Sequence, residues 1–225
     1  MPGVPTVAVS TREQIVLAAE RLFAEHGAEG VSLRHIAAAA GSGNNSVVQY
    51  HFGSKERLVQ AVFEYRLPRL QARRALLIDD RRPDDLRSWV ECQLRAVLEQ
   101  SDLDGSHYMG FVAMLYRHSR DLFVYVPDDV RAATRTFLSQ LDSCLTHIVE
   151  PLRTRRIAQA MALIVHAAAD RERARVRREP VLPFAIELAD LLDGTVGFLQ
   201  APASPTSLAA LEDADMTGLS WPVYL

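Results

Sequence analysis

Apolar residues recur every three or four positions along most of the chain, whereas the strict alternation typical of strands is nearly absent. This spacing predicts an all-α protein. The segment 11–26 is the clearest case, because its apolar positions share one helical face: Ile15, Ala18, Ala19, Leu22 and Phe23. Ser10 or Thr11 can cap the start of this helix, and Gly27 stands where a helix end favours glycine.

Two shorter helices are predicted next, each bounded by a glycine turn. Ser32 caps a helix that Gly41 ends, and after Gly43 a third helix covers about residues 45–51. The small residues 37–40 allow the second helix to pack closely on the third. Three short helices joined in this way are a candidate helix-turn-helix, in which the last helix enters the major groove.

A fourth helix begins after Ser54, and Pro68 lies inside its pattern. Because proline cannot donate the helical hydrogen bond, we expect this helix to end or kink near Arg66 or Leu67. A separate helical body follows, with expected helices at about 83–100, 106–119, 127–149, 151–177 and 184–199. The tail from residue 201 carries three more prolines and is expected to be largely disordered.

Several spaced motifs agree in order with one known family. They are Ile15-x-x-Ala18-Ala19-x-x-Leu22-Phe23, Gly27-x-x-Gly30-Val31-Ser32-Leu33-Arg34-x-Ile36-Ala37, Ala40-Gly41 and Tyr50-His51-Phe52-Gly53-Ser54-Lys55-Glu56-x-Leu58. On these motifs, residues 11–63 resemble the DNA-binding domain of the tetracycline-repressor (TetR) family. The resemblance covers about the first quarter of the chain. It implies a dimeric regulator and says little about a ligand, because the body of that family varies widely.

The predicted organisation follows from both lines of reasoning. We expect a flexible arm (1–10), a three-helix helix-turn-helix DNA-binding domain (11–56), a helical ligand-binding and dimerisation domain (57–200) and a tail (201–225). The arm lacks a basic leader and a long apolar segment, so it is not interpreted as a signal peptide.

The third helix and its neighbours supply the candidate DNA contacts. Asn and Gln donate and accept at once, which suits the edge of adenine, and a valine methyl suits thymine. Phosphates favour basic and hydroxyl groups and helix N-termini. The candidate DNA-binding residues are Ser32, Arg34, Asn44, Asn45, Ser46, Val47, Gln49, Tyr50, His51 and Lys55.

Two observations leave the assignment of base contacts open. Asn beside Gly is often simply a turn residue, because Asn tolerates left-handed geometry. The chain is also one residue longer than the usual family pattern between Ile36 and Phe52, which leaves the register of the contacts undecided. Residues 1–66 carry six basic and six acidic side chains, so binding depends on how these charges segregate.

The body is expected to dimerise and to hold a small molecule. A dimer places two reading helices on two half-sites of a palindromic operator. We expect the interface at about 152–177 and 184–199. Its apolar positions are Ile157, Met161, Ile164, Val165, Ala168, Ile186, Leu188, Leu192, Val196 and Phe198. The candidate ligand-binding residues are Trp89, Tyr108, Phe111, Met114, Phe137 and His147.

Composition sets further limits on function. The 225 residues carry a net charge of −3, which opposes coating nucleic acid through charge alone, and no apolar run is long enough to span a membrane. Cys92 and Cys144 have no zinc-type spacing; they suggest a reducing, cytoplasmic setting, although a redox disulfide between them stays open. The arginines from 171 to 178 are interpreted as a solvated helix end.

No catalytic motif such as GxSxG or HExxH occurs, and no metal or cofactor is assigned. The chain is therefore expected to be a sequence-specific transcriptional regulator, a repressor that a small apolar or aromatic ligand releases from a palindromic operator. The alternatives are a helical enzyme with an incidental helix-turn-helix and a ligand-independent architectural DNA-binding protein.

Overall fold

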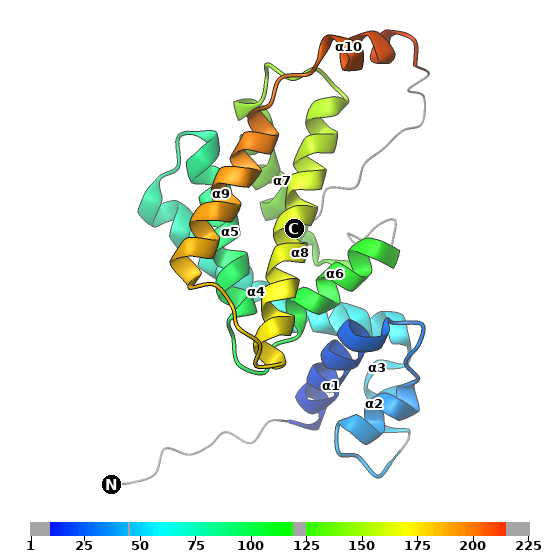
Figure 1. Ribbon diagram of the computed structural model, residues 1–225. Coiled ribbons are helices and arrows are strands. Elements are labelled where there is room, and N and C mark those ends of the chain that lie inside the picture. Colours follow the sequence, from blue (N-terminus) through cyan, green and yellow to red (C-terminus); the bar gives the residue numbers. More distant parts are fainter. Residues whose placement is uncertain (1–9, 45, 119–124, 215–225) are drawn as a thin grey trace, which may run out of the picture.

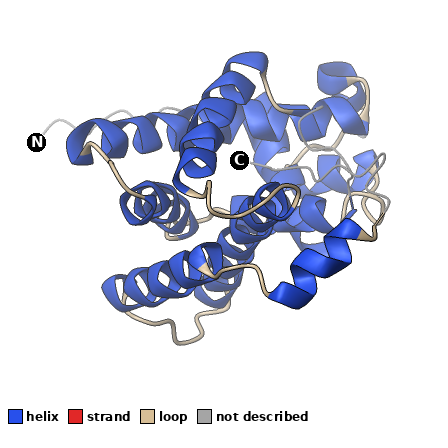
Figure 2. Cartoon of the chain, turned by 90° about the horizontal axis from the view of Figure 1, so that it is seen from above, coloured by secondary structure: helices blue, strands red, loops and turns tan. Residues whose placement is uncertain are grey.

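The computed structural model describes residues 10–44, 46–118 and 125–214, and these residues form helices without any strand (Figures 1 and 2). The helices are α1 (Thr11–His26), α2 (Leu33–Ala39), α3 (Val47–Phe52), α4 (Lys55–Arg81), α5 (Leu86–Ser101), α6 (Tyr108–His118), α7 (Asp128–Cys144), α8 (Leu152–Val176), α9 (Phe184–Gln200) and α10 (Pro205–Glu212). The all-α prediction is confirmed.

Local chemistry fixes the two ends of α1 as the sequence predicts. The Ser10 hydroxyl accepts a hydrogen bond from the Glu13 backbone N–H at 3.3 Å, and the Glu13 carboxylate accepts one from the Ser10 backbone N–H, so α1 begins with a capping box. Gly27 ends α1 with a φ of 76°, a backbone conformation that glycine adopts without strain.

Helices α1 to α3 form a small head at one end of the molecule, and α4 leads out of it into the body (Figure 1). The head is held together by buried apolar side chains, among them Phe23, Ile36 and Val48. α3 packs on α2 and on the start of α4, so its orientation is set by both neighbours.

Helix α4 corrects one of the two outcomes predicted for Pro68, namely that the helix ends near Arg66 or Leu67; a kink there stays a prediction. α4 continues through Pro68 to Arg81. The proline leaves the Glu64 carbonyl without its helical donor, and Glu64 is exposed, so water can satisfy that oxygen. Leu67 and Leu70 are buried on either side of the proline and hold both halves of the helix against the same core.

Helices α8 and α9 lie side by side along the body (Figure 1). Most of the apolar positions predicted to face a second subunit point instead into the chain's own core: Ile157, Met161, Ile164, Val165, Ala168, Leu188, Leu192 and Val196 are all buried. The prediction is wrong for these buried positions, whereas the predicted Ile186 and Phe198 are exposed and stay candidates for the interface. The large apolar side chains that these helices leave exposed are Leu163, Val176, Ile186 and Phe198.

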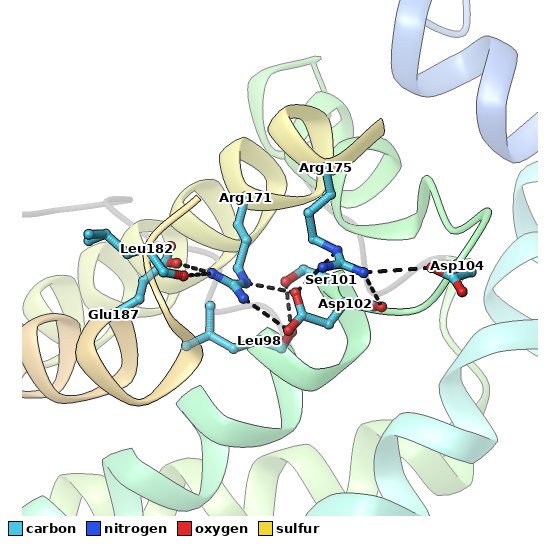
Figure 3. A network of polar contacts seen from close by, with 8 residues as sticks. All are labelled: Leu98, Ser101, Asp102, Asp104, Arg171, Arg175, Leu182 and Glu187. Atoms are coloured by element: carbon cyan, nitrogen blue, oxygen red, sulfur yellow. Dashed lines mark hydrogen bonds and ion pairs between the residues drawn. The ribbon is translucent and has the colours of Figure 1, made fainter. Parts of the chain in front are cut away.

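A polar network ties α8 to α5 and α9, and it corrects the interpretation of Arg171 as part of a solvated helix end (Figure 3). The Arg171 side chain is 4% exposed, and its guanidinium donates to both Asp102 carboxylate oxygens at 2.7 and 3.0 Å. It also pairs with Glu187 and donates to the Leu182 carbonyl at 2.8 Å. Arg175 donates to the Asp102 carbonyl at 3.0 Å.

The tail is more regular than expected. Ser204 caps a short helix, α10, whose Pro205 occupies the first turn, where the missing N–H has no helical partner to lose. None of its residues is buried. The expected arm lies almost wholly outside the described residues, which begin at Ser10. No helix in the described ranges is long and apolar enough to cross a membrane.

Candidate nucleic-acid interface

Helix α3 presents a short polar face to solvent. Val48 is fully buried beneath the helix and Phe52 is 8% exposed, so these two side chains anchor it to the head. On the opposite side Gln49 and His51 are exposed, and Tyr50 is 85% exposed, the largest value among the exposed large apolar or aromatic residues. Its ring contacts that of His51 at a centroid distance of 5.1 Å, and the rest of the side chain is open to water, so Gln49, Tyr50 and His51 are together available to contact a partner.

The turn before α3 uses one predicted base-reading residue for structure. The Asn44 side-chain oxygen accepts a hydrogen bond from the Ser46 backbone N–H at 2.9 Å, and the Asn44 backbone N–H donates to the Ser42 hydroxyl at 3.2 Å. Asn44 therefore has the turn role that asparagine often takes. Asn45 lies outside the described residues.

The predicted phosphate contacts lie on both sides of α3. Arg34 is exposed in the first turn of α2 and forms no ion pair with a described residue, while the Ser32 hydroxyl caps α2 by accepting from the His35 N–H at 3.1 Å. Lys55 begins α4, and its ammonium donates to the Ala28 carbonyl at 2.7 Å. Lys55 thus also fastens the loop after α1 to α4. Val47 is half-buried, and Ser46 is exposed.

The structure distributes the six predicted ligand-binding residues over three places. Tyr108, Phe111 and Met114 of α6 are almost fully buried. Phe111 lies 6.2 Å from Phe23 and 5.4 Å from Phe63, measured between ring centroids, so these aromatic rings join α1, α4 and α6. This cluster packs the head against the body, which is the ordinary role of buried aromatic side chains.

Trp89 and Phe137 do line an open space, a cleft of about 450 Å³ between α4, α5 and α7. Their rings meet edge to face at a centroid distance of 6.0 Å. His147 is exposed elsewhere, and its ring lies 3.4 Å from the Gln200 carbonyl. Of the six residues, Trp89 and Phe137 are the pair that the structure brings together at a cleft.

The junction between head and body contains two buried carboxylates that were not singled out from the sequence. Glu20 of α1 is 1% exposed and receives both hydrogen bonds of the Arg66 guanidinium, at 2.6 and 2.8 Å. It also accepts the His107 backbone N–H at 2.9 Å, just before α6. Glu20 thus links α1, α4 and the start of α6.

Glu172 of α8 is the second of these carboxylates. It accepts the backbone N–H groups of Met109 and Gly110 at 3.2 and 2.9 Å, in the first turn of α6, where the helix favours negative charge. Burial outweighs these hydrogen bonds and raises the pKa of Glu172 to about 7. Gly110 permits the close packing here, because a Cβ at that position would lie 3.2 Å from the Ala24 Cβ.

Comparison with known proteins finds that the head is similar to one protein family. Residues 15–62 match the model of the family described as bacterial regulatory proteins, tetR family. Over 54 residues the chain is 41% identical to the HTH-type transcriptional repressor AcnR of Corynebacterium efficiens, and over 53 residues it is 40% identical to AcnR of Corynebacterium glutamicum. Each match covers 24% of this chain and 28% of the relative, so the likeness in sequence is confined to the head.

Solved structures extend the likeness to the whole fold. A transcriptional regulator from Rhodococcus sp. Rha1 superposes with a TM-score of 0.56 at 23% identity, over 84% of this chain and 96% of that one. A putative tetR family transcription regulator from Shewanella sp. PV-4 gives a TM-score of 0.53 at 18% identity, over 85% and 96% of the two chains. At these identities the comparison concerns the fold alone.

Proposed function

We propose that the chain, whose residues 15–62 match the model of the tetR family of bacterial regulatory proteins, represses transcription by binding a palindromic DNA operator. The observation that carries the proposal is the outer face of α3. Gln49, Tyr50 and His51 are exposed together on a helix whose inner face is anchored by Val48 and Phe52. A helix held in this way can enter the major groove as a rigid unit.

We assign the contacts by chemistry. Gln49 is the base-reading residue, because its amide donates and accepts at once. Tyr50, His51 and Arg34 contact phosphates, and Lys55 adds positive charge beside the loop that it fastens. Asn45 remains a candidate for a base contact from its place in the sequence.

The body is proposed to dimerise, which brings a second copy of the head to the operator. Leu163, Ile186 and Phe198 are exposed apolar side chains on α8 and α9. Beyond the neighbouring residues and backbone of α9 itself, no described atom lies within 4 Å of where a Cβ would stand at Gly194 or Gly197. Two copies of this pair of helices are proposed to form a four-helix interface. Leu163→Glu together with Ile186→Glu is expected to yield monomers in sedimentation, with Leu76→Glu, at an exposed leucine of α4, as the control.

Release of the operator by a small molecule completes the proposal. We also propose that the chain acts in the cytoplasm, where its DNA target would lie. A ligand shifts the equilibrium between bound and released states only if it binds one of them more tightly. The cleft lined by Trp89 and Phe137 is the proposed ligand site. A change there can reach the head because α4 extends from the cleft to Lys55.

The test is selection of bound DNA from a random pool, followed by binding measurements on the selected sequence. We expect a palindrome. Gln49→Ala is expected to lower affinity for it about 10- to 100-fold and to leave affinity for unrelated DNA unchanged. Arg34→Ala is expected to weaken both and to reduce the salt slope by about one.

Arg87→Ala provides the control, because Arg87 is exposed on the body and pairs with Asp193. It is expected to change neither affinity. Selection of no sequence, or equal losses for Gln49→Ala and Arg34→Ala on every DNA, would contradict the proposal and its division into base and phosphate contacts.

A further inference from the structure

The cleft between α4, α5 and α7 has an apolar wall and one buried charge. Its apolar lining comprises Ala72, Ala75, Ile78, Trp89, Ala133 and Phe137. Its polar lining is neutral except for Arg74: the other polar residues are Gln71, Thr136 and Gln140. The volume of about 450 Å³ is within the range of small-molecule sites, and the exposed Ala75, Thr136 and Gln140 leave it open to solvent.

Arg74 is 5% exposed, and its described partners do not neutralise it. The guanidinium donates to the Gln93 side-chain oxygen at 3.0 Å and to the Gln71 side-chain oxygen, and it lies 4.9 Å from the centre of the Phe137 ring. No carboxylate of the described residues forms an ion pair with it. Burial lowers the pKa of Arg74 to about 10, so the group is still charged at neutral pH.

The other arginines buried to a similar degree have carboxylate partners. Arg66 is paired with Glu20, and Arg171 is paired with Asp102 and Glu187. A buried charge without a counter-ion is costly to the fold, and an anion that enters the site removes that cost. The single cation matches a single negative charge, and the planar guanidinium matches the planar carboxylate.

We propose that this cleft binds a monocarboxylate with an apolar body, whose carboxylate pairs with Arg74 while its apolar part lies against Trp89 and Phe137. The site itself depends on the cleft alone; its role as the effector site rests on the proposed function. A neutral apolar molecule leaves Arg74 unpaired, and a molecule with two or more negative charges brings charge that the apolar wall cannot match.

Trp89 reports on binding directly because it lines the cleft. The sequence has one other tryptophan, Trp221, so Trp89 is the only tryptophan of the Trp221→Phe variant. Decanoate and decan-1-ol are the two probes, since they share an apolar chain and differ in charge. We expect decanoate to change the Trp89 emission saturably and to bind at least tenfold more tightly than the alcohol.

Arg74→Met removes the charge and keeps most of the side-chain length. It is expected to weaken decanoate binding at least tenfold and to leave the alcohol unchanged. Arg73→Met is the matched control, because Arg73 is the next residue of α4, is exposed and pairs with Glu99; it is expected to bind both probes as the parent does. Arg74→Lys, which keeps the charge, is expected to retain the preference for decanoate.

Three results would overturn the proposal: no saturable change with decanoate, equal affinity for the two probes, or unchanged decanoate affinity in Arg74→Met. The proposal would also fail if Arg74→Lys and a folded Arg73→Met both lost the preference for decanoate over decan-1-ol, because the preference would then not depend on the charge at residue 74. These measurements contain no DNA. If decanoate binds through Arg74 and leaves operator affinity unchanged, the site stands and the proposed release by this ligand fails.

Discussion

Arg66 and Arg74 lie eight residues apart on α4, and both are largely buried. At Arg66 burial works against the charge, but the hydrogen bonds and charge of Glu20 outweigh it, so the pKa of Arg66 is raised. At Arg74 burial acts alone and the pKa is lowered. The same kind of side chain on the same helix thus has a carboxylate partner within the described chain at Arg66 and has none at Arg74.

This difference separates two uses of a buried charge. The pair at Arg66 connects α4 to α1 and, through the His107 N–H, to α6, so it fixes the junction between head and body. Arg74 connects α4 to neutral amides and faces a cleft. A charge that the fold satisfies holds the structure together, whereas a charge that the fold leaves unsatisfied favours binding of an anion from outside.

The sharpest way to break the comparison is the same substitution at both arginines. Arg66→Met leaves the Glu20 carboxylate buried without its counter-ion, and we expect it to lower the free energy of unfolding by about 3–5 kcal/mol. Urea denaturation measures the loss. Arg73→Met, at an exposed ion pair of the same helix, is expected to change it by less than about 1 kcal/mol. A loss at Arg66 as small as that would show that the pair does not hold the junction.

Glu172 extends the comparison to a buried carboxylate without a cationic partner in its hydrogen bonds. Its pKa is raised to about 7 by burial, so the folded state holds the proton more tightly than the unfolded state does. This contribution to stability is present below the unfolded pKa and is lost as the pH rises through about 7. Glu172→Gln keeps an acceptor for the N–H groups of α6. The difference in free energy of unfolding between this variant and the parent is expected to shift in favour of the variant by about 2 kcal/mol from pH 4.5 to pH 8.5.

Thermal or urea unfolding of the parent and Glu172→Gln across that pH range measures the gain. Glu179→Gln serves as the control, because Glu179 is exposed close to the end of α8. If the free energy of unfolding changed with pH by the same amount in the parent and in Glu172→Gln, the assignment of this pH dependence to Glu172 would be wrong.

Arg74→Met gives the smallest and the opposite effect. Without ligand, replacement of a buried unpaired charge by an apolar side chain is expected to raise the free energy of unfolding by about 1 kcal/mol, because the lost desolvation cost exceeds the lost hydrogen bonds to Gln71 and Gln93. Urea denaturation of the ligand-free chain measures this. A loss of several kcal/mol would mean that Arg74 is structural, like Arg66.

The parts of the fold that local chemistry controls were predictable from the sequence. The bounds of α1 follow from Ser10 and Gly27, which act within one helical turn of the residues they cap. The buried anchor Val48 and the exposed Gln49 and Tyr50 follow from the alternation of apolar and polar positions on a helix whose inner face is already known.

The errors occur where distant contacts decide. Pro68 is a local signal to end a helix, and the core beneath Leu67 and Leu70 overrides it. Glu20 and Arg66 are separated by 46 positions, so nothing local announces their pairing. Arg74 did leave a signal: it stands in the apolar register of α4 between Leu70 and Leu77, where a charged residue is out of place unless it has a partner or a use.

The position of Arg66 gives α4 a mechanical property. The Glu20 pair clamps the helix at one point, about 16 Å along its axis from Lys55 and about 12 Å from Arg74. Because Glu20 belongs to the head and Arg66 to the helix that lines the cleft, we expect a displacement of α4 at the cleft to be passed to α1 through this pair. Pro68 lies between Arg66 and Arg74, and bending of α4 at that point would absorb part of such a displacement.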